Sequence, residues 1–198
     1  MNLNEKPMMI FKGHVKIIDF DTKEVLVEDS NDIHPENMSY AIAQSIAGNQ
    51  AGVITTMRFG NGGTSIVQAQ DLINYKRPNT TGLAELYNET YAKIINNEVD
   101  PSVDDSYNSV RAVHISGQVF SDIVCTCTLG LNEPSDAATN DRTQQLGIEE
   151  IDRDQYLFDE LGLYDNEGKH LTHIIFHPVQ KSKNRVLQVI YTVRAQLV

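Results

Sequence analysis

The 198-residue sequence has only two cysteines and no tryptophan. No second cysteine pair exists that could complete a four-cysteine zinc site with Cys125 and Cys127. The longest apolar runs are a few residues, far short of the ~20 that a membrane-spanning helix needs. The polar start, Met1 to Lys6, does not have the pattern of a secretory signal. We therefore expect a protein that is made in a cytosol and has no membrane partner.

Positive charge is also scarce. The chain has 16 Lys and Arg against 27 Asp and Glu, and its formal net charge is −11. A field of this sign repels nucleic-acid phosphates and anionic lipid headgroups, so we expect no specific nucleic-acid binding. One local group of cations, Lys181, Lys183 and Arg185, is typical of a solvated turn between two strands.

The hydrophobic content of 40% and the charged content of 22% are those of an ordinary globular protein. The length favours one domain. We predict a flexible N-terminal arm over residues 1–8 and a single β-rich domain over residues 9–198. We predict extended insertions at two polar stretches, at about 66–109 and 132–154. Long loops on a compact core usually carry contacts or function.

Apolar residues alternate with polar ones in most of the chain, which indicates strands. Residues 15–28 predict a hairpin that turns at residues 21–23. Residues 110–131 place their apolar side chains on one parity, and Gly117 marks a bulge, a bend or a turn between two strands. Residues 185–198 predict a long half-buried strand. The fold class is therefore mainly β, with β-sandwich-like antiparallel sheets and long polar loops.

Near the N-terminus, the spacing of apolar residues changes from that of a strand to that of a helix. Met38, Ala41, Ile42 and Ile46 are spaced as the apolar stripe of an amphipathic helix. Pro35 suits the first turn. We predict a helix over about residues 36–47 that packs against the sheets.

Three histidines and the two cysteines are the candidate metal ligands. His170, His173 and His177 lie in a strand pattern, where His173 and His177 share one face and His170 points to the other. We interpret them as half-buried and edge histidines, with a metal site as the less favoured alternative. Cys125 and Cys127 share the apolar face of a strand and predict small core residues rather than a disulfide. We expect no metal and no cofactor.

The glycine-rich loop Gly60-Asn61-Gly62-Gly63-Thr64 could hold an anion with its backbone N–H groups. It lacks the lysine and spacing of a P-loop and the full dinucleotide-binding pattern. The alternative is a turn that lets two chain segments approach closely.

Carboxylates are plentiful, but no spacing marks a catalytic pair. We interpret them as solvated loop residues, and we expect no catalytic residues. The groups are Asp100, Asp104 and Asp105; Glu149, Glu150, Asp152 and Asp154; and Asp159, Glu160 and Asp165.

Three segments together resemble virion structural proteins of tailed bacteriophages, of the kind found in neck, tail and baseplate. They are GHVKIIDFDTKEVLVEDSNDIHPENMSYAIAQSIAG, MRFGNGGTS and FDELGLYDNEGKHLTHIIFHPVQKSKNRVLQVIYTVRAQL. The third is also similar to attachment domains of phage tail fibres. The resemblance covers most of the chain except residues 65–110 and 132–154. It implies a multi-copy assembly protein of the virion, without enzymatic activity, whose partners are neighbouring copies and other tail, neck or fibre proteins.

Two further functions stay open. A fibre-attachment or host-glycan-binding module would use exposed aromatic residues, and Tyr75, Tyr87, Tyr91 and Tyr107 fall in the irregular region. A cell-wall hydrolase would need a pocket with paired carboxylates. For the assembly role, the candidate subunit-contact residues are those of the glycine-rich loop and of the predicted helix start: Gly60, Asn61, Gly62, Gly63, His34, Pro35, Glu36 and Asn37.

Overall fold

The computed structural model describes residues 8–67, 72–134 and 155–198. The regular structure of these residues consists of strands, one α-helix and a short 3₁₀ turn at Gln50–Gly52. The helix is α1 (Pro35–Ile46), and the strands are β1 (Met9–Asp19), β2 (Val25–Ile33), β3 (Ile54–Gly60), β4 (Thr64–Val67), β5 (Leu72–Tyr75), β6 (Glu89–Ile94), β7 (Ser109–His114), β8 (Phe120–Leu129), β9 (Gln155–Asp165), β10 (His170–Ser182) and β11 (Leu187–Leu197).

Nine strands form one sheet in the order β6-β3-β9-β10-β2-β1-β11-β8-β7, and β4 and β5 form a separate hairpin. Every strand pairing is antiparallel. The predicted mainly β, sandwich-like fold with one amphipathic helix is confirmed. The long C-terminal strand lies inside the sheet, between β1 and β8, and Gly117 (φ 87°) lies in the turn between β7 and β8.

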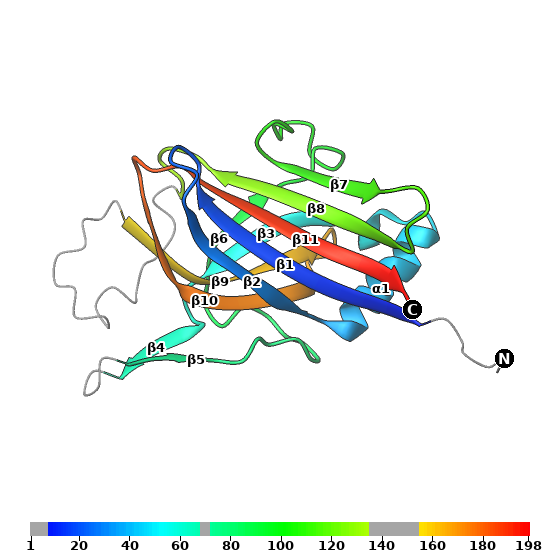
Figure 1. Cartoon of the computed structure of the whole chain (residues 1–198), viewed down its shortest axis with the longest axis horizontal. Helices are drawn as coiled ribbons and strands as arrows, with labels where there is room; N and C mark the ends of the chain where they lie inside the picture. Colours follow the sequence, from blue (N-terminus) through cyan, green and yellow to red (C-terminus); the bar gives the residue numbers. More distant parts are fainter. Residues whose placement is uncertain (1–7, 68–71, 135–154) are drawn as a thin grey trace.

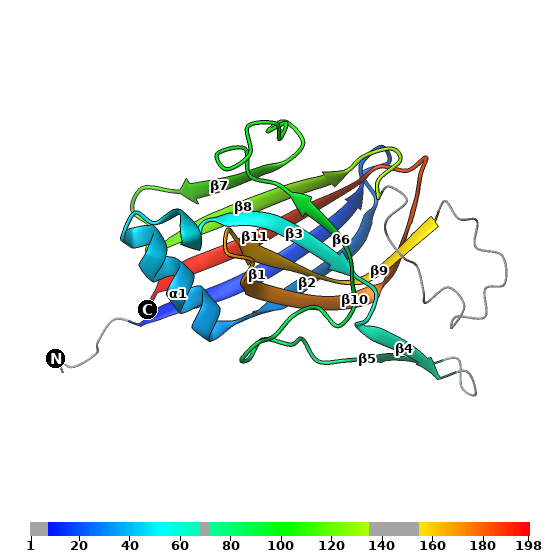
Figure 2. The same cartoon turned by 180° about the vertical axis from the view of Figure 1, so that it is seen from behind.

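The sheet curls so that its two halves face each other as layers. Strand β2 makes the bend, because its residues 25–31 pair with β1, whereas Asp32 and Ile33 pair with β10. One layer contains β1, β11, β8 and β7, and the other contains β10, β9, β3 and β6. The two layers and the β4–β5 hairpin that projects from them are visible from opposite sides in Figure 1 and Figure 2.

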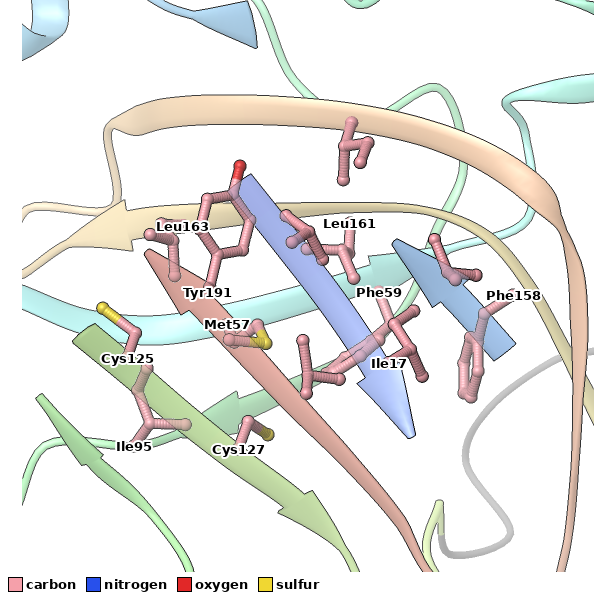
Figure 3. Packing of buried hydrophobic residues seen from close by; sticks show 14 of the residues in the cluster. Ile17, Met57, Phe59, Ile95, Cys125, Cys127, Phe158, Leu161, Leu163 and Tyr191 are labelled. Atoms are coloured by element: carbon pink, nitrogen blue, oxygen red, sulfur yellow. The ribbon is translucent and has the colours of Figure 1, made fainter. Parts of the chain in front are cut away.

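The core fills the space between the layers (Figure 3). Ile17 and Tyr191 reach it from one layer, and Met57, Phe59 and Leu163 reach it from the other. Burying one such side chain stabilises the fold by about 1.5–3 kcal/mol. Cys125 and Cys127 are unpaired and fully buried here, so the prediction of small core residues is confirmed. Burial raises the pKa of each thiol to about 12.

Helix α1 lies within two residues of its predicted bounds. His34 caps it, since its Nδ1 accepts a hydrogen bond from the Asn37 N–H (3.2 Å). Met38 and Ala41 are buried, but Ile46 is 83% exposed. The apolar stripe therefore packs onto the sandwich only through its first two turns.

Two predictions need correction. Residues 72–109 are not a free insertion, because β6 is part of the nine-stranded sheet and Ala84, Leu86 and Ile95 are buried. Lys181 is not in a solvated turn: its ammonium is fully buried in β10 and donates to the carbonyls of Gly130 and Ser182 (both 2.9 Å). The predicted arm (except Met8) and residues 135–154 of the second insertion lie outside the described residues.

Candidate functional site

Two adjacent carboxylates of β9, Asp159 and Glu160, are both 0% exposed. The sequence-based interpretation of these groups as solvated loop residues is wrong, and Asp165 at the end of the strand is also buried. Gly60, the last residue of β3, lies opposite Glu160 in the sheet register. The carboxylates therefore lie beside the glycine-rich loop that follows β3.

Asp159 is bound by this loop. Its Oδ1 accepts a hydrogen bond from the Gly63 N–H (2.8 Å), and its Oδ2 accepts from the Thr64 N–H (2.9 Å) and hydroxyl (2.5 Å). The backbone N–H groups of Gly63 and Thr64, which the sequence offered to an external anion, thus bind a carboxyl group of the protein itself.

Glu160 accepts four hydrogen bonds. Oε1 accepts from the Gly62 and Asn88 N–H groups (2.9 and 2.8 Å), and Oε2 accepts from the Tyr87 N–H (2.9 Å) and His173 Nε2 (3.1 Å). Burial raises the pKa of this carboxyl, but the bonds from His173 and the three amides outweigh burial, and the net pKa is below its ordinary value. Glu160 is therefore ionised inside the protein.

The glycines permit this close approach. A Cβ on Gly60 would lie 2.5 Å from the Asn88 carbonyl oxygen, and one on Gly62 would lie 2.6 Å from the Asn88 nitrogen. Gly60, Asn61, Gly62 and Gly63 are all buried. We therefore reassign this loop, which we expected at a subunit contact, to an internal role.

The histidines do not follow the simple alternation of a strand. The register of β10 against β9 shifts between His170 and Thr172. As a result, His170 and His173 lie on the same face, with ring centroids 5.2 Å apart and exposed fractions of 1% and 0%. His177 is exposed. The prediction that His170 points to the opposite face from His173 is wrong because of this bulge.

The start of α1 contacts the same region. Asn37 Nδ2 donates to the His170 carbonyl (2.8 Å), and His34 is 1% exposed. Pro35 and Glu36, by contrast, are exposed and available to a partner. We call Asp159, Glu160, His34, His170 and His173 the carboxylate–histidine cluster.

A second polar group links the layers at another place. Lys93 of β6 donates to the Thr128 carbonyl (2.8 Å) and to the Glu133 carboxylate. Glu133 also accepts from the Gly130 N–H (2.8 Å) and the Tyr91 hydroxyl (3.4 Å). Burial raises the Glu133 pKa, but the contacts with Lys93 and Gly130 outweigh burial and leave the pKa below its ordinary value.

The geometry of the carboxylate–histidine cluster is that of a structural clamp. Both carboxylates are inaccessible to solvent and accept hydrogen bonds from main-chain amides. Both ring nitrogens of His173 are engaged, because Nε2 contacts Glu160 and Nδ1 accepts from the Asn79 N–H (2.8 Å). A general base must reach a substrate proton. Glu160 and His173 are both fully buried, so neither side chain can reach the proton of a substrate.

Among the described residues, no group of three or more His, Cys, Asp or Glu side chains is arranged to hold a metal ion. No helix in the part of the chain that the structure describes is long and apolar enough to cross a membrane. Comparison of the chain with protein families, with curated proteins and with solved structures found no match.

The positions of Asp159 and Glu160 in the sequence indicate that they are buried, although the overall composition does not. Asp159 and Glu160 interrupt an apolar strand pattern formed by Tyr156, Phe158, Leu161 and Leu163. Carboxylates within such a run are buried only when they are paired. In the structure the partner is the glycine-rich loop, whose amides bind both carboxyl groups. Which loop meets which strand depends on sheet order, which local sequence does not give.

Proposed function

We propose that this chain is a non-enzymatic structural protein of a tailed-phage virion. In this role it forms a multi-copy ring or collar in the neck or tail and joins neighbouring components. The resemblance of three sequence segments to virion proteins is the starting point. The internal occupation of the carboxylate–histidine cluster is compatible with a role in which surfaces, rather than reactive groups, do the work.

The three resembling segments contribute neighbouring strands. The first contains β2 and most of β1, the second contains the end of β3, and the third contains β10, β11 and most of β9. In the sheet these strands are consecutive, in the order β3-β9-β10-β2-β1-β11. The resemblance thus corresponds to one contiguous framework, and the remaining strands, β6, β8 and β7, extend it at both ends.

The observation that carries the proposal is the edge strand β7. It is the last strand of the nine-stranded sheet, and it pairs only with β8. Three apolar residues on it and in the following turn are exposed: Val113 (48%), Ile115 (60%) and Val119 (63%). An edge with exposed apolar side chains favours pairing with a strand of another chain. Assembly proteins can join copies by such strand addition.

Substitution of the edge tests this proposal. Ile115→Lys together with Val113→Lys should lower the association of the chain with itself or with tail particles at least tenfold, because a charged edge resists strand addition. Co-sedimentation with particles from a phage lysate measures it. Leu131→Lys is the matched control, since Leu131 is also 60% exposed but lies outside β7. Equal association of both variants and the unmodified chain would contradict a role of this edge.

One observation favours the alternative of a glycan-binding or fibre-attachment module. Tyr75 and Tyr87 are 52% and 41% exposed, and Lys76 Nζ lies 4.2 Å from the centre of the Tyr87 ring. Exposed aromatic rings beside a cation can stack on sugars and bind their acidic substituents. Binding of the chain to a glycan array that Tyr87→Ala abolishes would favour this second function over assembly.

A further inference from the structure

The coil that joins β5 to β6 is tied to the outer face of the sandwich. We call residues 76–88 the strap; in Figure 1 and Figure 2 this segment runs beside β10, outside the two layers. Within the strap, Ala84 and Leu86 are buried, while Leu83 is fully exposed. The strap contains no helix or strand. Its position therefore depends on its bonds to the sheet.

Most of these bonds join the strap's main chain to ionisable side chains. Asn79 N–H donates to His173 Nδ1, and the Tyr87 and Asn88 N–H groups donate to Glu160. Leu86 N–H donates to the Tyr164 hydroxyl (3.4 Å), and His34 Nε2 donates to the Gly82 carbonyl (3.1 Å). A change in the protonation of these side chains therefore changes how the strap is held.

The contacts require His34 and His173 to be uncharged. In each ring Nδ1 accepts a hydrogen bond from a main-chain N–H, while Nε2 faces an acceptor. The proton is therefore on Nε2. A second proton would go to Nδ1, where it would meet the N–H of Asn37 or of Asn79. Protonation of His173 thus removes its hydrogen bond to the strap residue Asn79. Protonation of His34 removes its cap of helix α1, and His34 is also the residue that contacts the strap at the Gly82 carbonyl.

His170 is uncharged for a different reason. Its ring stacks on Tyr164 (centroids 4.7 Å apart), and within the described residues neither ring nitrogen has a hydrogen-bond partner of good geometry. Burial, with a smaller contribution from His173, lowers the His170 pKa to about 3, and nearby backbone of Thr172 and Ala84 offsets part of this. In an open strap the ring would meet water, and its pKa would return toward 6.5.

Charged groups of both signs lie around the histidines. On β9, the Glu160 carboxylate lies 3.1 Å from His173 Nε2. On β3, the Arg58 guanidinium lies 3.9 Å from the same Tyr164 ring that His170 stacks on, which opposes a charge on His170. Asp32 of β2 pairs with His173 in the register, and Glu85 of the strap interacts with the Tyr164 hydroxyl. The nearest carboxylate, Glu160, already contacts Nε2 and leaves Nδ1 facing the strap.

We propose that the strap is released by acid: protonation of the histidines beneath it detaches residues 76–88 from β9 and β10 while the sandwich stays folded. The sign follows from linkage. A histidine whose pKa is lower in the closed state binds a proton only in the open state, so closure is stable above the open-state value of 6.5 and weakens as the pH falls below it. Release uncovers Glu160, Tyr164, His170 and His173. This property does not depend on the proposed function.

Hydrogen exchange of the intact chain tests the proposal. Each histidine that takes up a proton only when the strap opens raises the open population by a factor that approaches tenfold per pH unit below 6.5, or roughly 16-fold between about pH 6.5 and pH 5.0. After correction for intrinsic rates, the amides of Asn79, Tyr87 and Asn88 should lose protection by at least this factor. The amides of β11 should keep theirs. Equal strap protection across this range, or joint loss in the strap and β11, would overturn the proposal.

Two variants identify the group responsible. His170→Phe keeps an aromatic ring against Tyr164 but takes up no proton, so the pH dependence of strap protection should become shallower by about one factor of ten per pH unit. His177→Phe, on the same strand but exposed, should leave the pH dependence unchanged. If His170→Phe does not fold, the pH dependence of strap protection in the unmodified chain still tests whether acid releases the strap. A folded His170→Phe variant with the full slope would refute the role of His170.

Discussion

At the scale of residues, the most informative feature is that Asp159 and Glu160 bind the loop that could have bound an external anion. Buried carboxylates are costly unless several donors reach them. Here Gly62, Gly63 and Thr64 supply amides on one side, and Tyr87 and Asn88 supply them on the other. The two carboxylates thus fasten both the loop and the strap to β9.

The closeness of these segments makes Gly62 intolerant of any side chain. Gly62→Ala should destabilise the protein by about 1–3 kcal/mol, because the new Cβ would lie 2.6 Å from both the Asn88 nitrogen and Tyr87 Cβ. Urea unfolding measures the change. Gly130→Ala is the control, since a Cβ there meets nothing closer than 3.6 Å, and it should change stability by less than about 0.5 kcal/mol. Similar values for both variants would show that the loop is not tightly enclosed.

At the scale of elements, the regular spacing of apolar residues predicted helices and strands, whereas a break in the register of a strand was not predicted. The period of 3.6 predicted α1, and the period of 2 predicted β11 with its buried Leu187, Val189, Tyr191 and Val193. The bulge in β10 was not predicted from the alternation of residues. One extra residue there reverses the face that every later side chain occupies. That single shift brings His170 beside His173.

The long-range placement of β6 also escaped prediction. Its sequence alone permits a helix or a strand, and its partner β3 is more than thirty positions away along the chain (Phe59 opposite Tyr91). Pairing supplies the hydrogen bonds that make it a strand, and tertiary context overrides local propensity. Lys93 then reaches across from this strand to the end of β8.

This cross-layer contact gives a prediction for Lys93. Lys93→Met should destabilise the protein by about 1–3 kcal/mol near pH 7, because it leaves the part-buried Glu133 carboxylate without its cation. The folded-state pKa of Glu133 is below the ordinary 4.5, so this stabilisation is present above 4.5 and is lost as the pH falls through the folded value. Unfolding measured at about pH 7 and about pH 3.5 should therefore show a smaller difference between variant and parent in acid.

Lys16→Met is the control for this pair. Lys16 contacts Glu28 on the surface at 3.5 Å, and surface pairs contribute about 0–1 kcal/mol. Its effect should be small and nearly independent of pH. A Lys93→Met variant that behaves in the same way would show that the contact does not hold the layers together.

At the scale of the whole molecule, the sheet has two terminal strands, β6 and β7, at opposite ends of its order. Strand β6 is held near β8 by Lys93, whereas β7 presents an apolar edge. A molecule whose Asp159 and Glu160 carboxylates are bound internally and whose sheet ends in such an edge is suited to joining copies or neighbours in an assembly.

The mass of the chain in solution tests the assembly role most directly. Sedimentation velocity over a wide range of concentrations, alone and with purified tail particles, compares the observed mass with the 22.2 kDa of one chain. We predict either a closed oligomer of defined size or a monomer that sediments with the particles. A monomer at every concentration that also fails to sediment with particles would contradict the account.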